Sequence, residues 1–288
     1  MSAAAGADPA PSHDRLIATC GLPRLEARAL LEHASGKPRE WLIAHGDETA
    51  PPEAARRFRE LARRRRDAGE PLAYLLGIRE FHGRDFEVDA AVLIPRPETE
   101  ALVDLAIACG PARARVLDLG TGSGCIAITL VCLRADWSVV ATDRSAAALA
   151  VARRNARRLC PQALAGRRLE LREGDWWQTV AAGERFDLIV SNPPYVAADD
   201  AHLAGGDLRF EPQSALVGGD DGLEAMRTIC AGAAARLEPG GRLMVEHGFD
   251  QGAAVAALFA AGGLVEVRTL ADAAGLDRIT TGAMPLPS

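Results

Sequence analysis

The feature that most constrains the fold is an alternation of short apolar segments with helical stretches, which starts at Glu98 and runs through the rest of the sequence. Short segments rich in Val, Ile and Leu are typical of buried strands, and helices fit between most of them. Strands that alternate with helices form a mostly parallel sheet covered on both faces. We therefore predict a doubly wound α/β domain. Its candidate strands are Arg115–Leu119, Ser138–Thr142, Leu169–Arg172, Asp187–Ser191, Arg242–Glu246 and Val265–Thr269.

A helical segment precedes this domain. Leu25, Leu30 and Leu31 recur near helical spacing, and Gly36 is a typical helix stop. We predict a small helical bundle with a modest core of its own. The first eleven residues are rich in Ala, Gly and Pro, so we expect a disordered tail there.

A turn that contains glycine, with an aromatic residue on each side, connects the helical segment to the α/β domain. Phe81 and Phe86 flank this turn, which predicts a β-hairpin. We divide the chain into a tail (1–11), a helical N-terminal domain (12–78), a hairpin linker (79–96) and a catalytic domain (97–288).

The charge balance is acidic, with a formal net charge of -6. A protein that wraps nucleic acid by bulk electrostatics is normally basic, so this balance argues against a general DNA or RNA binder. Arginines do crowd one helix between Arg56 and Arg66, and a phosphate-binding face is one interpretation. Because Glu60 and Asp67 are interspersed, we favour a solvated helix surface, and a partner contact at this face stays open.

The six cysteines are scattered without a C-x-x-C pair, and the histidines have no metal-ligand spacing. We expect no metal and no disulfide framework. The N-terminus lacks the pattern of a secretory signal, and no apolar run is long enough to span a bilayer. We therefore expect a soluble, cytoplasmic protein without membrane contact.

A buried strand runs directly into the glycine-rich turn Gly120-Thr121-Gly122-Ser123-Gly124 and then into a helix. Glycines let backbone approach a ligand, and a helix N-terminus presents unpaired N–H groups. Asp143 ends the next strand, where a carboxylate accepts hydrogen bonds from both ribose hydroxyls. A dinucleotide fingerprint would need glycine at Cys125. The spacing instead resembles the nucleoside pocket of class I methyltransferases, whose ligand is S-adenosylmethionine; a tight turn without ligand is the alternative.

Two tryptophans follow the third predicted strand, in the segment Gly174-Asp175-Trp176-Trp177. In doubly wound geometry this loop lies beside the adenine of the ligand. An acidic side chain there accepts from the exocyclic amine, and an aromatic ring offers a stacking face. We assign Trp176 to the cofactor and expect one of the two rings to belong to the core.

The segment Asn192-Pro193-Pro194-Tyr195 directly follows an apolar strand and is the sharpest signal in the chain. An amide or amino nitrogen is a poor nucleophile, because its lone pair is delocalised. Two acceptors, the Asn192 side-chain oxygen and the Pro193 carbonyl, can hold both of its N–H bonds, and proline keeps the loop stiff. Tyr195 gives a flat face for a planar substrate group. The alternative interpretation is an ordinary turn after a strand, without a functional role.

N-P-P-Y marks amino-group methyltransferases generally, including DNA adenine N6 enzymes, so the motif does not choose the substrate. With Ile94-Pro95-Arg96-Pro97-Glu98-Thr99-Glu100 upstream, the chain resembles the release factor glutamine methyltransferase (PrmC/HemK) family. The likeness covers most of the chain and includes the segments Tyr74–Gly77, Phe81–Val88, Glu211–Pro212 and Gly218–Leu223.

The resemblance implies a Rossmann-like class I methyltransferase domain and a helical N-terminal domain that helps bind a class 1 release factor. It implies methyl transfer from S-adenosylmethionine, with S-adenosylhomocysteine as product, to the amide nitrogen (N5) of the glutamine in the Gly-Gly-Gln motif. Family roles place the cofactor on Gly120–Gly124, Asp143, Trp176 and Asn192, and the substrate on Asn192, Pro193, Pro194 and Tyr195. Asn192, Pro193 and Tyr195 are the predicted catalytic residues.

Two other functions stay open at this point. One is a DNA or RNA amino-methyltransferase, which would be expected to carry a target-recognition domain or a broad basic surface. The other is an inactive cofactor-binding module that acts as a translation partner, against which the intact Asn192 and Tyr195 argue. We expect a monomer with no direct nucleic-acid contact. His247, beside Glu246, is expected to be a hydrogen-bonded structural residue and not a general base.

Overall fold

The computed structural model describes residues 10–287 and divides the chain into two compact units, one ending at Gly77 and one beginning at Ile78. The predicted disordered tail lies outside the described residues except for its last two positions. Within residues 10–287, no helix combines the length and the apolar character needed to cross a membrane.

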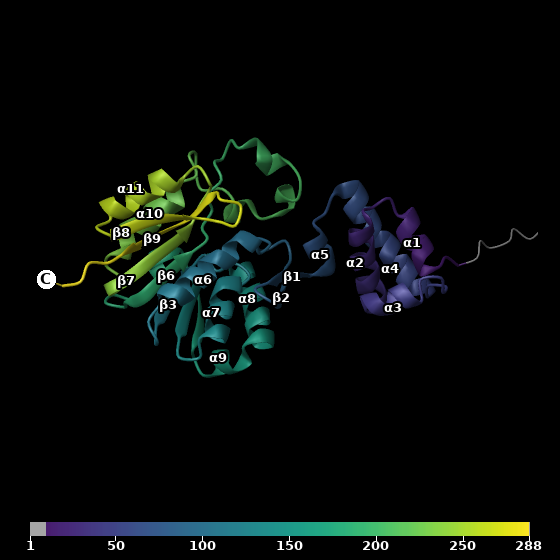
Figure 1. Cartoon of the computed structure of the whole chain (residues 1–288), viewed down its shortest axis with the longest axis horizontal. Helices are drawn as coiled ribbons and strands as arrows, with labels where there is room; N and C mark the ends of the chain where they lie inside the picture. Colours follow the sequence, from purple (N-terminus) through teal and green to yellow (C-terminus); the bar gives the residue numbers. More distant parts are fainter. Residues whose placement is uncertain (1–9, 288) are drawn as a thin grey trace, which may run out of the picture. The chain divides into compact units, whose positions relative to one another are not determined.

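The first unit is a bundle of short helices (Figure 1). Leu30, Leu31 and Phe58 are buried in its core, whereas Leu25 is 71% exposed and lies outside the apolar stripe. Gly36 has a φ of 67°, the left-handed conformation with which many helices end. The helices are α1 (His13–Thr19), α2 (Arg24–Ser35), α3 (Arg39–Ala44), α4 (Pro52–Arg63), a π-helical turn (Arg64–Ala68) and α5 (Leu72–Leu76).

The arginines at the end of α4 and in the π-helical turn are mostly in ion pairs. Arg65 reaches Glu26 of α2 at 2.7 Å and so ties the turn to that helix. The other pairs are Arg56–Glu53, Arg63–Glu60, Arg64–Glu70 and Arg66–Asp67. Much of the positive charge is therefore compensated locally, which agrees with a solvated helix surface.

The second unit contains a seven-stranded sheet in the order β5-β4-β3-β6-β7-β9-β8. The strands from β5 to β7 in this order are parallel, and β9 is antiparallel to both of its neighbours. The predicted fold class, a doubly wound and mostly parallel sheet, is confirmed. The strands are β3 (Arg115–Leu119), β4 (Ser138–Asp143), β5 (Leu169–Glu173), β6 (Phe186–Ser191), β7 (Leu237–Glu246), β8 (Val265–Ala271) and β9 (Asp277–Ala283).

Two features of the sheet were missed in the sequence. Strand β9 lies between β7 and β8, and its buried positions include Thr280 and Thr281 in place of the apolar residues that mark a buried strand. Strand β7 begins at Leu237, five residues before the predicted start, because Gly240 and Gly241 inside it look like a turn. A register shift between β6 and β7 accommodates this glycine segment.

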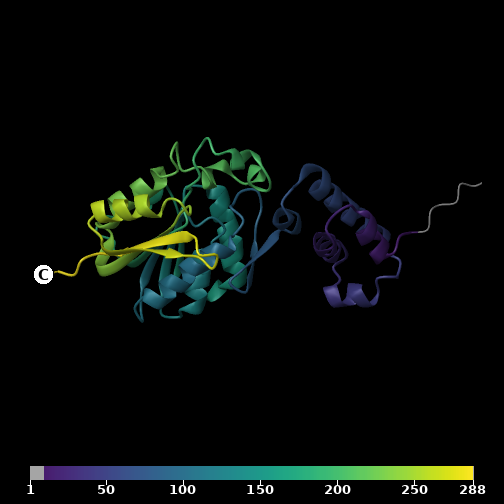
Figure 2. The same ribbon diagram turned by 45° about the horizontal axis from the view of Figure 1, so that its top comes forward.

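The sheet separates two cores. Val116 and Val190 face the core formed by α6, α7 and α8, whereas Leu117 and Ile189 face the core formed by α10 and α11. Neighbouring residues on a strand point to opposite faces, so strands buried on both sides are apolar throughout. Figures 1 and 2 show the two helical layers. The helices are α6 (Glu100–Cys109), α7 (Cys125–Leu133), α8 (Ala146–Leu159), α9 (Pro161–Ala165), α10 (Glu224–Ala233) and α11 (Gly252–Ala261).

The hairpin at the start of the second unit consists of β1 (Ile78–Phe81) and β2 (Arg84–Glu87). Its turn residues His82 and Gly83 both have positive φ, as a two-residue type I′ turn requires. Phe81 and Phe86 are fully buried with ring centroids 6.0 Å apart, in the core shared with α6 and α7. The hairpin is therefore packed into the second unit.

Short 3-10 turns occur mainly near the carboxyl edge of the sheet. They are Pro97–Thr99, Trp176–Thr179, Ala201–Ala204, Leu208–Phe210 and Gln213–Ala215, the last three within the long connection from β6 to α10.

Candidate active site

A cavity of about 330 Å³ lies at the carboxyl ends of β3, β4 and β6. Doubly wound sheets bind ligands at this edge, where successive connections leave for opposite faces, and the volume is in the usual range of small-molecule sites. The predicted cofactor residues that line the cavity are Gly120, Thr121, Gly122, Ser123, Asp143, Trp176 and Asn192. Gly124 does not line it. Of the predicted substrate residues, Asn192 and Pro194 line it, whereas Pro193 and Tyr195 do not.

The glycines of the loop after β3 have different surroundings. All three have positive φ, at 73°, 55° and 83° for Gly120, Gly122 and Gly124. A Cβ atom on Gly122 would have no atom within 4 Å, so the backbone there is open to a ligand. A Cβ atom on Gly124 would lie 2.8 Å from Ile128 and 3.3 Å from Ala152. Gly124 therefore packs the loop tightly on α7 and α8, which explains its absence from the cavity wall.

Asp143 at the end of β4 orients the loop. Its Oδ2 atom accepts the Gly122 N–H at 2.9 Å, and its Oδ1 atom accepts the Ser145 N–H at 2.9 Å. Burial raises the pKa of the Asp143 carboxyl, and these two hydrogen bonds act in the opposite direction. A carboxylate has about four lone-pair positions, so roughly two remain for hydroxyl groups of a ligand.

Asp118 lies behind the same loop and is completely buried. Burial raises the pKa of its carboxyl to about 7, although the Thr121 hydroxyl donates to its Oδ2 atom at 2.6 Å. The Oδ1 atom of Asp118 has no hydrogen-bond partner among residues 10–287. Asp118 therefore holds the Thr121 side chain in place, although burial of a carboxyl with one unbonded oxygen is unfavourable.

The two neighbouring tryptophans have separate roles. Trp176 has an unusual positive φ of 40° and lines the cavity, with its ring 3.9 Å from the position of a Cβ on Gly120. Trp177 packs against Gly232, where a Cβ would lie 2.2 Å from its ring, and its N–H donates to the Thr228 carbonyl at 2.8 Å. Trp177 thus belongs to the packing around α10, and Trp176 presents an aromatic wall to the cavity.

The reaction loop, residues Asn192–Tyr195, is tied to the glycine loop through the preceding residue. The Ser191 hydroxyl donates to the Leu119 carbonyl at 2.7 Å, which holds the ends of β6 and β3 together. The side-chain amide nitrogen of Asn192 donates to the Thr99 hydroxyl at 2.9 Å. Among residues 10–287, no donor is bonded to the Asn192 Oδ1 atom or to the Pro193 carbonyl. Two acceptors are thus available at adjacent positions.

Tyr195 is partly buried, and desolvation raises the pKa of its phenol to about 12. Its ring packs at the margin of the core formed by α10 and α11. The charges that act on the phenol include Glu246, Arg278 and Arg96.

A second loop, residues Leu216–Gly222, presses against the reaction loop. Backbone hydrogen bonds of 2.9 Å join Val196 to Leu216 and to Gly218. A Cβ on Gly222 would lie 2.3 Å from the Tyr195 carbonyl oxygen, a distance that only glycine avoids. The Gln251 side-chain nitrogen donates to the same carbonyl at 3.0 Å. The back of the reaction loop is therefore held by backbone packed on backbone.

The segment that leads into α6 is fixed by a buried carboxylate. Glu211 accepts the Ile94 N–H at 3.0 Å and forms an ion pair with Arg96, and its side chain has no exposed area. Arg96 and Pro95 line the cavity. A buried charge needs such partners to be tolerated, so Glu211 and Arg96 fix this wall of the site together.

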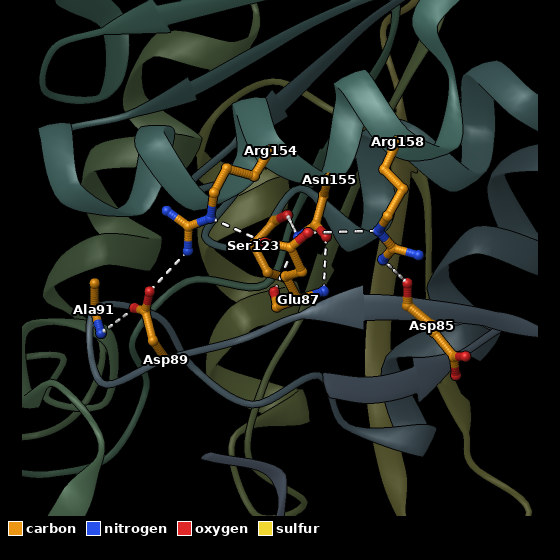
Figure 3. A network of polar contacts seen from close by, with 8 residues as sticks. All are labelled: Asp85, Glu87, Asp89, Ala91, Ser123, Arg154, Asn155 and Arg158. Atoms are coloured by element: carbon orange, nitrogen blue, oxygen red, sulfur yellow. Dashed lines mark hydrogen bonds and ion pairs between the residues drawn. The ribbon is translucent and has the colours of Figure 1, made fainter. Parts of the chain in front are cut away.

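Asn155 of α8 connects the hairpin to the glycine loop (Figure 3). Its side-chain oxygen accepts the Glu87 N–H at 2.7 Å, and its nitrogen donates to the carbonyls of Glu87 at 3.0 Å and Ser123 at 2.9 Å. Arg154 pairs with Glu87 and Asp89 just outside this contact. The buried Asn155 amide therefore continues the hydrogen bonding of β2 as a neighbouring strand would.

His247 is fully buried and hydrogen-bonded at both ring nitrogens, to the Gly248 carbonyl and the Thr280 hydroxyl, each at 2.8 Å. The expectation of a structural histidine is confirmed. Among the polar residues that sequence reasoning did not assign to the site, Thr99 lines the cavity, and Glu246 follows Val245, the partner of Ser191 in the sheet register. Glu246, the last residue of β7, is 1% exposed, and burial raises the pKa of its carboxyl to about 7. In the sequence, the signal for Glu246 is a charged residue at the end of an apolar strand.

A parallel sheet with an inserted antiparallel strand, carrying a glycine loop after β3 and an aspartate after β4, defines a class I methyltransferase. The chain matches the PrmC N-terminal domain over residues 14–77 and the methyltransferase small domain over residues 99–207. It belongs to the release factor glutamine methyltransferase family. The release factor glutamine methyltransferase of Bordetella pertussis is 52% identical over 93% of this chain and 97% of its own length.

Further relatives agree with this placement. The Burkholderia pseudomallei release factor glutamine methyltransferase is 52% identical over 94% of this chain and 95% of its own length. A crystal structure of a methyltransferase from Pyrococcus furiosus superposes with a TM-score of 0.54 at 17% identity, over 72% of this chain and 91% of that chain. The latter similarity concerns the fold alone.

Proposed function

We propose that this protein transfers a methyl group from S-adenosylmethionine to the side-chain amide nitrogen (N5) of the glutamine in the Gly-Gly-Gln motif of class 1 peptide chain release factors. The observation that carries the proposal is the pair of acceptors beside the glycine loop, Asn192 Oδ1 and the Pro193 carbonyl, for which residues 10–287 provide no donor. The 52% identity to proteins named release factor glutamine methyltransferase supports the same substrate.

The cavity at the carboxyl ends of the strands fits the cofactor. Gly122 leaves the backbone open, Asp143 retains lone pairs for the two ribose hydroxyls, and Trp176 offers a flat face for the adenine. Gly120, Thr121, Ser123 and Asn192 are assigned to the same ligand, and Gly124 shapes the loop. When bound, S-adenosylmethionine supplies a methyl group on a positively charged sulfur.

The residues of the reaction loop act on the substrate nitrogen. Asn192 Oδ1 and the Pro193 carbonyl accept its two N–H bonds, which fixes the nitrogen and favours a more tetrahedral geometry. The amide lone pair would then be aimed at the methyl carbon, and the electrons of the broken C–S bond would stay on the sulfur of the S-adenosylhomocysteine product. The methylated nitrogen would give up one of its two protons to solvent, so catalysis consists mainly of positioning and electrostatics. Pro194 lines the cavity, and we assign Pro194 and Tyr195 to contact with the planar amide.

The site needs one chain only, because all the residues assigned to it come from the second unit. We assign the first unit to binding of the release factor. The chemistry described requires no metal, and we infer that the enzyme acts as a monomer.

The test uses purified protein, labelled S-adenosylmethionine and a class 1 release factor, followed by peptide mapping. We expect one methyl group on the Gly-Gly-Gln glutamine and none on a factor in which that glutamine is alanine. Asn192→Ala should abolish turnover while the melting temperature stays close to that of the wild type. Label on duplex DNA or ribosomal RNA, with none on the factor, would refute the substrate assignment and leave the amino-group chemistry intact.

A further inference from the structure

The orientation of the Asn192 amide is the critical property of the reaction loop. The two ends of an amide group have nearly the same size and shape, but only the oxygen end accepts a hydrogen bond. If the group turned over, its N–H bonds would face the N–H bonds of the substrate. The protein must therefore hold the nitrogen end elsewhere.

The Thr99 hydroxyl holds the nitrogen end of this amide. Asn192 Nδ2 donates to Thr99 Oγ1 at 2.9 Å, and the two residues are 93 positions apart in the chain. Thr99 is only 2% exposed and ends the 3-10 turn Pro97–Thr99 before α6. A hydroxyl that accepts this bond still has its own proton to donate.

Glu246 is the group placed to accept that proton. Val245 of β7 lies opposite Ser191 of β6 in the parallel register, so the residues that follow each, Glu246 and Asn192, emerge side by side. Thr99 and Asn192 act on the Glu246 carboxyl by lowering its pKa against the effect of burial, so this carboxyl lies near both side chains, and its Oε2 atom has no hydrogen-bond partner among residues 10–287. In its ionised form the Glu246 carboxylate can only accept, which gives the hydrogen bonding one direction, from Asn192 through Thr99 toward Glu246.

We propose that Thr99 and Glu246 are positioning residues, which keep the Asn192 nitrogen pointed away from the substrate and its oxygen pointed toward the glutamine amide. This inference rests on the proposed function, because it concerns the same site. It assigns a catalytic contribution to two buried side chains that do not themselves touch the reacting atoms.

The test compares Thr99→Val with Thr99→Ser. Valine has nearly the shape of threonine but neither donates nor accepts, whereas serine retains the hydroxyl. We expect Thr99→Val to lower kcat about 10–100-fold, less than the roughly 100–1000-fold loss found when a group that contacts the reacting atoms directly is removed. The Kd of S-adenosylhomocysteine should change less than kcat, because Asp143 and the glycine loop are untouched. Thr99→Ser should restore at least half of the wild-type kcat.

A Glu246→Gln variant provides a second, independent test. Glutamine can donate as well as accept, so the direction of the chain is lost while the volume is kept, and kcat should fall with cofactor affinity unchanged. Wild-type kcat in both Thr99→Val and Glu246→Gln would overturn the inference. An equal loss of kcat in Thr99→Val and Thr99→Ser would also overturn it, since the hydroxyl would then be irrelevant. Failure of the wild-type enzyme to methylate the release factor would instead refute the proposed function.

Discussion

The contact between Gly222 and the reaction loop gives a prediction whose size follows from geometry. In Gly222→Ala, the new methyl group would lie 2.3 Å from the Tyr195 carbonyl oxygen and 2.8 Å from the Gln251 side-chain nitrogen. A normal carbon-to-oxygen contact is longer by about 1 Å, so the reaction loop must move by about that distance. Displacement of a reacting geometry by about 1 Å costs on the order of 100-fold in rate.

The same substitution affects stability through two effects. Gly222 has a φ of 72°, and a non-glycine residue in this conformation costs about 1–2 kcal/mol. Overpacking against a rigid backbone adds about 1–3 kcal/mol. The free energy of unfolding should therefore fall by roughly 2–5 kcal/mol in total.

Gly183→Ala is the matched control. Gly183 has a φ of 79°, a Cβ there would have no atom within 4 Å, and it does not line the cavity. The control should therefore lose only about 1–2 kcal/mol of stability and keep its kcat. The assays are chemical denaturation, methyl transfer to the release factor, and calorimetric binding of S-adenosylhomocysteine, whose Kd should not change in either variant. If Gly222→Ala keeps a kcat within threefold of that of Gly183→Ala, the packing of the two loops does not position the reaction loop.

Two further substitutions test the cofactor side of the site. Asp143→Asn should weaken S-adenosylhomocysteine binding about 10–100-fold, because hydrogen bonds to a charged acceptor contribute roughly 1.5–3 kcal/mol. Glu173→Gln changes an exposed residue at the end of β5 and is the control, which should bind S-adenosylhomocysteine with the wild-type Kd in the same calorimetric assay. Asp118→Asn tests the buried carboxyl. A pKa raised to about 7 in the folded state means that the contribution of Asp118 to stability is present below the unfolded pKa near 4 and is lost as the pH rises through 7. Between pH 5 and pH 8, the free energy of unfolding of the wild type should fall by roughly 3 kcal/mol more than that of Asp118→Asn. If the difference in stability between the two proteins is the same at both pH values, the raised pKa is contradicted.

The parts of the site that could be predicted from sequence are those encoded within a few residues. The glycine loop after β3 and the reaction loop after β6 each combine an apolar strand with a short motif, so both their position and their chemistry are local. Gly124 is an instructive exception, because it has the φ of a ligand-binding glycine but serves packing on α7 and α8. Motif spacing alone does not distinguish these two uses.

The residues that could not be predicted act across the fold. Thr99 and Glu246 lie near Asn192 because the start of α6 and the end of β7 are packed beside β6; the charge at the end of β7 marks Glu246 as unusual, but no local pattern shows that either residue meets Asn192. The same holds for Gln251, which holds the Tyr195 carbonyl from the start of α11. Strand β9 was missed for a different reason, since its buried positions include threonines that pair their hydroxyls within the sheet, such as Thr280 with Thr269.

The position of β9 has a consequence for how the chain folds as it is synthesised. β8 pairs with the sheet only through β9, although β9 comes later in the chain. While the ribosome is still adding the residues before Asp277, β8 has no partner and β7 presents an open strand edge, which is a surface prone to pairing with other chains. The helical unit before Ile78 can fold early, whereas the sheet closes only when β9 arrives. Nascent chains stalled before Asp277 should therefore be sensitive to proteolysis in the second unit and protected in the first.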